Sequence, residues 1–146
     1  MEETEVKVLY RNNDRTVIRF DVGEQFPQKL ADWCEKESVQ AAAIVAGIGM
    51  LENIEIGRYD GKEYITEKVE PSSEILSLQG NVSIKEGKPF VHLHVSLADE
   101  DMSARGGHLF NGTVSMTIEL VILELSSKFV RIPSGGTFWR LDIPED

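Results

Sequence analysis

The chain of 146 residues has one cysteine, no cluster of basic residues and no long apolar run, and each absence excludes a class of protein. Cys34 has no second cysteine to pair with, so the chain is not a disulfide-stapled scaffold, and a reducing compartment suits it. No apolar run reaches the roughly 18 residues of a membrane helix, and the N-terminus MEETEVKVLY lacks the apolar stretch of a secretory signal. We therefore expect a cytoplasmic protein without a membrane span.

Positive charge is also scarce. The chain has 15 Lys and Arg against 25 Asp and Glu, which gives a net charge of −10. Proteins that bind nucleic acid through its phosphates cluster Lys and Arg, and this sequence contains no basic run. The charge balance therefore argues against direct binding of duplex DNA. The acidic triplet at 99–101 lacks the ligand spacing of a calcium loop and is predicted to be a solvated loop.

The rest of the composition is that of one globular domain. Hydrophobic residues make up 41% of the chain and charged residues 27%. A chain of this length buries roughly two-thirds of its extended-chain surface on folding. No internal repeat or low-complexity linker divides the sequence, so we expect a single domain over residues 1–146.

Most of the sequence alternates apolar and polar residues over short stretches that turn residues separate, which is typical of strands joined by hairpins. Asp60-Gly61 is a strong two-residue hairpin signal. Gly47-Ile48-Gly49 predicts a bend or bulge, because no helical pattern follows it. Strands are expected over residues 6–9, 16–20, 41–45, 54–59, 63–69, 74–84, 90–95, 113–125, 129–132 and 137–141.

One main helix is predicted over residues 24–37, with Pro27 in its first turn. A second, short helix is expected near residues 99–103. The fold class is therefore α/β in the α+β sense, a single domain with a mostly antiparallel mixed β-sheet and one main packed helix. The apolar face of the main helix comprises Phe26, Leu30, Trp33 and Cys34.

All three histidines of the chain lie between His92 and His108. In a strand, alternate side chains point to opposite faces, so His92 and His94 share one face while Val91, Leu93 and Val95 share the other. His108 follows Gly106-Gly107, and we expect this glycine pair to turn the chain back toward the other histidines.

Three imidazoles placed in this way could bind a divalent transition metal, with zinc the ion that suits them best. His92, His94 and His108 would leave a position open for water or a small anion, because the sequence identifies no fourth protein ligand. The alternative is that His92 and His94 lie on a partly exposed sheet face and that His108 belongs to an unrelated loop.

Five segments, in this order, resemble the plant and prokaryote conserved (PPC) domain: GIGML at 47–51, IGRYDGKEY at 56–64, EILSLQGNV at 74–82, HLHVSLAD at 92–99 and GGHL at 106–109. The resemblance implies a homotrimer and a regulatory or DNA-associated role. In plants, AT-hook arms joined to the domain carry the DNA binding. This chain has no such arm and is similar to the prokaryotic branch.

Two classes of function remain open. The first is a trimeric protein that binds a metal ion or a partner, as a regulatory scaffold would. The second is a metal-dependent hydrolase or lyase, in which the ion lowers the pKa of a bound water to about 7. Glu119 and Asp99 are the acids that could reach the ion, and no catalytic residue or substrate is identified.

Overall fold

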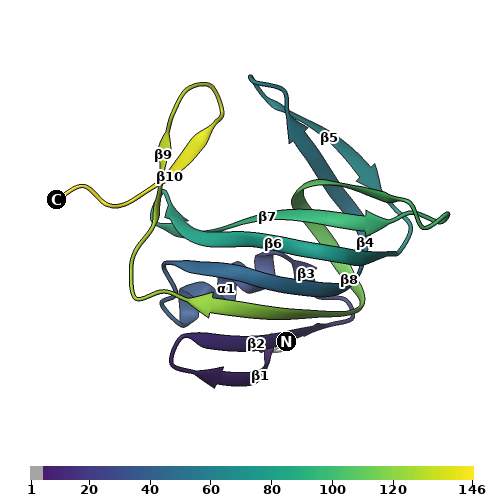
Figure 1. Cartoon of the computed structure of the whole chain (residues 1–146), viewed down its shortest axis with the longest axis horizontal. Coiled ribbons are helices and arrows are strands. Elements are labelled where there is room, and N and C mark those ends of the chain that lie inside the picture. Colours follow the sequence, from purple (N-terminus) through teal and green to yellow (C-terminus); the bar gives the residue numbers. More distant parts are fainter. Residues whose placement is uncertain (1–4) are drawn as a thin grey trace.

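Ten strands and one helix make up residues 5–146, the part of the chain that this computed structural model describes (Figure 1). Residues 1–4, the start of the acidic N-terminus, lie outside it. No helix among the described residues has the length and apolar character needed to cross a membrane. The elements are β1 (Lys7–Asn12), β2 (Arg15–Asp21), β3 (Gln25–Phe26), α1 (Gln28–Lys36), β4 (Ala42–Tyr59), β5 (Tyr64–Val69), β6 (Ser73–Lys85), β7 (Lys88–Ala98), β8 (Ala104–Glu124), β9 (Val130–Pro133) and β10 (Trp139–Asp142).

The strands form one sheet in the order β1-β2-β8-β4-β6-β9-β10, with β3, β5 and β7 paired off this path. The pairs are antiparallel, except that β6 and β9 meet in parallel where Ile84 pairs with Val130. Because β7 pairs with both β6 and β8, the four strands β8, β4, β6 and β7 close a ring. The predicted single domain with a mostly antiparallel mixed sheet and one helix is confirmed.

The longest strands, β4 and β8, bend as they run through the sheet (Figure 1). The sequence predicts separate strands over 41–45 and 54–59, but the structure joins them in β4. Register shifts against β8 bend β4 without ending it, and one of them lies between Gly49 and Leu51. Gly49 has φ +147°, and a Cβ on it would lie 2.0 Å from the carbonyl oxygen of Thr117. The predicted bulge at Gly47–Gly49 is therefore confirmed.

The helix packs its apolar face into the core, where Leu30, Trp33 and Cys34 are buried as the sequence predicts. It begins at Gln28 rather than at residue 24, so the predicted start is wrong. Residues 25–26 instead pair with β8 as the short strand β3, which also buries Phe26. Apolar spacing alone does not distinguish a Phe26 buried by the first turn of a helix from a Phe26 buried by a short strand. Burial raises the pKa of the Cys34 thiol to about 12, which makes Cys34 a structural residue.

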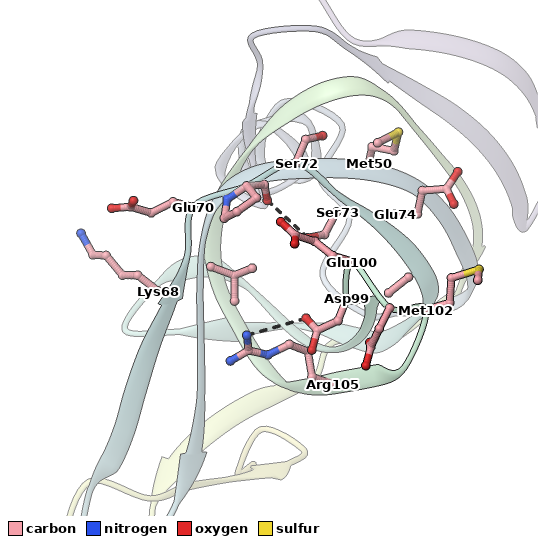
Figure 2. A pocket seen from close by; sticks show the side chains of 14 residues that line it. Met50, Lys68, Glu70, Ser72, Ser73, Glu74, Asp99, Glu100, Met102 and Arg105 are labelled. Carbon is pink, nitrogen blue, oxygen red and sulfur yellow. Dashed lines mark hydrogen bonds and ion pairs between the residues drawn. The ribbon is translucent and has the colours of Figure 1, made fainter.

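Residues 99–103 form the turn between β7 and β8, so the second helix predicted there is wrong. The Asp101 carboxylate accepts hydrogen bonds from the backbone N–H and the hydroxyl of Ser103, which favour a turn over a helix. Beside this turn lies an open hollow of about 940 Å³, in which Arg105 is 3.7 Å from Asp99 (Figure 2). None of the histidines lines this hollow.

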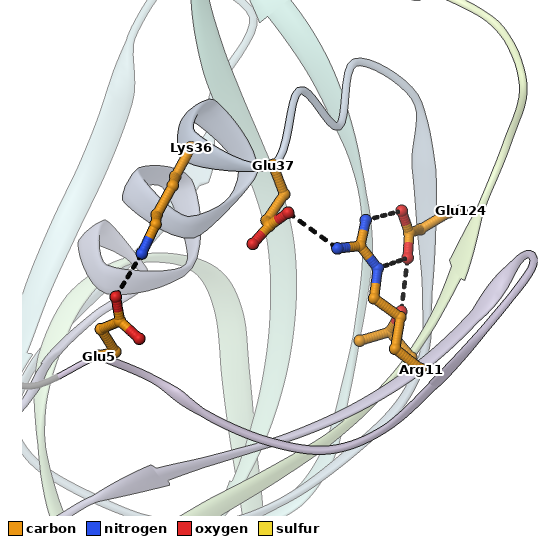
Figure 3. Close-up of polar contacts among 6 residues, drawn as sticks. Glu5, Arg11, Lys36, Glu37 and Glu124 are labelled. Atoms are coloured by element: carbon orange, nitrogen blue, oxygen red, sulfur yellow. Dashed lines mark hydrogen bonds and ion pairs between the residues drawn. The ribbon is translucent and has the colours of Figure 1, made fainter.

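An ion-pair network ties the edge hairpin β1–β2 to the body of the fold (Figure 3). The Arg11 guanidinium donates to both carboxylate oxygens of Glu124, at 2.9 and 3.1 Å, and to Glu37 at 2.9 Å. The hydroxyl of Thr16, which is buried, also donates to Glu124. Burial alone would raise the pKa of Glu124, but the hydrogen bonds from Arg11 and Thr16 outweigh it and lower that pKa.

We expect Glu124→Gln to lower the free energy of unfolding by about 1 kcal/mol at neutral pH, because the charge-assisted pair with Arg11 is lost. Because folding lowers the pKa of Glu124, its ionised carboxylate stabilises the fold fully above about 4.3, the pKa of a glutamate carboxyl in the unfolded chain. This stabilisation is lost as the pH falls through the pKa that Glu124 has in the folded protein. The difference between wild type and variant should therefore shrink in acid. Urea unfolding at pH values from about 3 to 7 measures it.

The matched control is Glu145→Gln, which removes the same charge from the C-terminal tail and should leave unfolding unchanged. A difference between wild type and Glu124→Gln that does not vary with pH would contradict the role given to the network.

Candidate metal centre

His92 and His94 lie on the same face of β7, as strand alternation predicts. Val91, Leu93 and Val95 point into the core from the opposite face and fix the orientation of the strand. The two imidazole rings lie with their centroids 5.0 Å apart. The local sequence therefore holds two ligand-type side chains side by side.

His108 joins the other two histidines from β8, where it pairs directly opposite His94. Its ring centroid lies 5.1 Å from that of His92 and 6.1 Å from that of His94. One nitrogen from each of the three rings lies within 4.8 Å of the other two. The alternative that places His108 in an unrelated loop is therefore wrong.

Gly106 and Gly107 lie within β8 and do not form the turn that the sequence predicts. Their role is to let backbones approach one another closely. A Cβ on Gly106 would lie 2.0 Å from the carbonyl oxygen of Val95 in β7, and one on Gly107 would lie 2.5 Å from that of Gly57 in β4. The glycine pair therefore seats β8 between β7 and β4 and brings His108 to the other histidines.

Two of the three rings are held in the neutral form that binds metal ions. Burial, together with the charges of His108, Arg131 and His94, lowers the pKa of His92 to about 4. Burial likewise lowers the pKa of His108 to about 4, helped by His94 and Arg131. The Nδ1 atom of His108 is buried and has no hydrogen-bond partner among the described residues. A bound ion would satisfy this nitrogen, so the donor set fits a transition metal.

Arg131 of β9 borders the histidine cluster, and its place there was not predicted from the sequence. Its guanidinium lies 3.3 Å from Nδ1 of His92 and donates to the side-chain oxygen of Asn81 at 2.7 Å. Asn81 is also the residue of β6 that pairs with His92. The sequence does contain a signal for it: Arg131 lies between Val130 and Ile132, and a cation within an apolar strand pattern indicates a role other than packing.

Neither acid that the sequence offered as a partner joins the histidines. Among the Asp, Glu and Cys side chains of residues 5–146, none lies within the cluster that could hold an ion. Asp99 faces Arg105 in the open hollow beside the turn at 99–103. Glu119 is exposed on β8 and pairs with Ile48 of β4. The candidate centre therefore consists of three imidazole ligands with a cation, not a carboxylate, beside them.

Comparison with known proteins identifies the family. The model of the Plants and Prokaryotes Conserved (PCC) domain matches residues 10–126. The chain belongs to this family, the PPC family. A crystal structure of a PPC protein from Pyrococcus horikoshii is 34% identical, with 96% of this chain and 97% of that one covered and a TM-score of 0.78.

Two further solved structures are relevant to the questions of metal binding and of DNA binding. A metal-containing protein from Archaeoglobus fulgidus is 33% identical, with 96% of this chain and 99% of that one covered and a TM-score of 0.79. A Ralstonia eutropha protein, for which DNA binding is only suggested, is 23% identical, with 88% and 91% covered and a TM-score of 0.80. At this identity, the likeness to the Ralstonia protein shows a shared fold and nothing about function.

A curated relative of this PPC chain is much longer. The bifunctional protein GlmU of a Synechococcus strain is 28% identical over 124 residues, which is 82% of this chain and 19% of that protein. The chain therefore spans about a fifth of the length of the curated relative that it matches.

We expect Gly106→Ala to destabilise the PPC fold by more than about 2 kcal/mol, because the added methyl group would overlap the Val95 carbonyl. The control on the same strand is Gly112→Ala, whose Cβ would meet Leu51 at an ordinary 3.4 Å. Thermal unfolding of both variants measures the difference. Equal stability of the two would contradict the close approach of β8 to β7.

Proposed function

We propose that this PPC protein binds one divalent transition metal ion, zinc before others, through His92, His94 and His108. The observation that carries the proposal is the convergence of the three rings, with one nitrogen from each within 4.8 Å of the other two. The buried, unpartnered Nδ1 of His108 supports it. So does the likeness to the metal-containing Archaeoglobus protein, at 33% identity over nearly the whole chain.

Zinc suits this donor set because it accepts neutral imidazole nitrogen and is commonly held by three protein ligands. When bound, the ion would act as a Lewis acid toward water or a small anion in its remaining position. His92 and His108 are neutral at physiological pH and need release no proton to bind it. The family role that we propose is a regulatory one, exercised in the cytoplasm, and the buried lone thiol of Cys34 is consistent with that compartment.

The competing function is a metal-dependent hydrolase or lyase. Such an enzyme needs an acid or base that exchanges protons at the open metal position. No carboxylate of the described residues lies in the histidine cluster, and Asp99 and Glu119, the two acids considered, face elsewhere. This arrangement favours binding over catalysis.

We further propose that the chain assembles as a homotrimer, as the family resemblance implies. In support, several exposed apolar side chains lie on the outer face of β4, β6 and β8, beside the exposed carboxylate of Glu119. Ala46 pairs with Val121 on this face, and Ile48 pairs with Glu119. A group of exposed apolar side chains on one face of a small domain is typical of an interface. The exposed large apolar side chains of these strands are Val45, Ile48, Leu76, Met116 and Val121.

Zinc binding should depend on all three histidines. His108→Ala should weaken zinc binding by at least about 100-fold, because even loss of an outer-sphere partner costs 10–100-fold. The triple alanine variant should retain no zinc. Ser96→Ala, which changes the same face of β7 outside the cluster, should bind as wild type does. Elemental analysis and titration against a chelator measure the affinity, and metal retained by the triple variant would place the site elsewhere.

Light scattering should give a mass three times that of the 16.4 kDa chain at micromolar concentration. Ile48→Glu should reduce the mass to that of a monomer, because it would bury a second carboxylate beside that of Glu119 in the proposed interface. Ile143→Glu introduces the same charge in the exposed C-terminal tail and should leave the trimer intact. A monomeric wild type would refute the proposed assembly.

The isolated chain should not bind duplex DNA with useful affinity. Binding through counterion release needs several Lys or Arg against phosphates, and a net charge of −10 opposes it. Titration with random-sequence duplex near 150 mM salt should show no saturable binding tighter than about 10⁻⁶ M. A DNA-associated role would then require a partner that carries the DNA contacts. Saturable binding below that limit would overturn this prediction.

A further inference from the structure

A cavity of about 740 Å³ opens beside the histidine cluster. It lies between the first turn of α1, the hairpin β4–β5 and the hairpin β9–β10, and both His92 and His108 line it. The two hairpins meet at its edge, where the Thr137 hydroxyl donates to the carbonyl of Lys62 at 3.1 Å. The volume falls within the roughly 300–1,000 Å³ of small-molecule sites.

Several aromatic side chains line the cavity. Tyr64 and Phe110 stand edge to face with centroids 5.1 Å apart, and the His108 ring lies 4.3 Å from Phe110. Phe90 and Trp139 line the same cavity from β7 and β10. Aromatic walls of this kind suit a ligand with a flat apolar body, because offset and edge-to-face contacts add to the burial of apolar surface.

Two cations also line the cavity, and no carboxylate of residues 5–146 forms an ion pair with either of them. Arg131 donates to neutral acceptors, the side chains of Asn81 and Ser83 and the backbone carbonyl of Trp139. Lys85 places its ammonium over the rings of Phe90 and Trp139, at 5.0 and 4.7 Å from their centroids. In a chain of net charge −10, this local excess of positive charge stands out.

A metal ion would add to that excess and would also change the contacts of Arg131. Arginine can only donate, so Nδ1 of His92 accepts from Arg131 in the structure. If His92 bound the ion through Nδ1, the ion would replace this contact. If it bound through Nε2, the ring hydrogen would move to Nδ1, which could no longer accept. Either way, an N–H of Arg131 loses its acceptor and becomes available to a ligand.

We propose that this cavity binds a small organic oxyanion with a flat apolar body. The anionic group, a carboxylate or a phosphate ester, is held between Arg131 and the open metal position, and the body packs against Phe90, Phe110 and Trp139. A planar guanidinium recognises such oxyanions through paired hydrogen bonds. The inference rests on the proposed metal-binding function, since the metal contributes part of the charge and frees the Arg131 donor.

The test uses the full-length, zinc-loaded chain and four probes. Benzoate is compared with acetate, and phenyl phosphate with inorganic phosphate, so that each pair shares an anionic group and differs in the ring. Calorimetric titration should show that at least one ring-bearing probe binds at least tenfold more tightly than its ringless counterpart. Quenching of Trp139 fluorescence should accompany binding and disappear in Trp139→Phe, which leaves only the buried Trp33.

Variants assign the anionic end of the site. Arg131→Gln should weaken binding of that probe about 10- to 100-fold, the loss expected for hydrogen bonds to a charged group. Arg131→Lys keeps the charge without the planar fork and should give an intermediate loss. The matched control, Arg140→Gln, removes the same charge from the same hairpin, where Arg140 pairs with Asp142, and should bind within twofold of wild type.

Failure of the two proposals can be told apart. A chain that takes up no zinc in a titration without any anion would refute the metal site, and with it this inference. Normal zinc binding refutes the inference alone if neither ring-bearing probe binds more tightly than its ringless counterpart. The same holds if Arg131→Gln and Arg131→Lys both bind as wild type does.

Discussion

The pairing of β7 with β8 places His94 directly opposite His108, and the histidine cluster depends on this register. Side chains in a strand alternate with a period of two, so a slip of one residue would turn His108 away from His92 and His94. The register is held by the turn at 99–103, by buried Leu97 on β7, and by the absence of a side chain at Gly106. Packing, turn geometry and steric fit therefore agree on a single arrangement of the three rings.

The site combines electrostatic features that differ from those of the whole molecule. The chain carries an excess of ten negative charges. Yet the side chains around the histidines are neutral or positive, with Arg131 and Lys85 bordering the same cavity. Charges at the surface are screened by water and salt, whereas those beside a partly buried cavity act on whatever enters it. The negative charge of the whole chain therefore opposes binding of DNA, whereas the positive charge beside the cavity favours binding of small anions.

Much of the fold could be predicted from sequence because strand alternation and turn residues are local signals. The alternation in β7, a hairpin near Asp60-Gly61 and the buried face of α1 follow from neighbouring residues alone. The predicted two-residue loop of that hairpin is wrong, because the loop spans residues 60–63, where the Asp60 carboxylate accepts hydrogen bonds from the backbone N–H groups of Lys62 and Glu63. The continuity of β4 could not be predicted, because a bulge at Gly49 and a break between strands have the same local sequence signature. The start of α1 and the role of Gly106-Gly107 depend on pairing with β8, which is distant in sequence. Arg131 was missed for the same reason, since 39 residues separate it from His92.

The course of β8 limits where the chain can change in length. This strand carries His108 toward its start and the core residues Ile118 and Leu120 toward its end, with no loop between them. One residue inserted between these points would turn either the histidine or the core residues to the wrong face, unless a new bulge absorbed it. Insertions and deletions should therefore be tolerated better at the hairpin tips 60–63 and 134–138 than at the turn 99–103, which holds the register of the histidines. The tips 60–63 and 134–138 meet at the edge of the cavity beside the histidines, so changes in loop length there would alter its entrance while leaving the histidines in place.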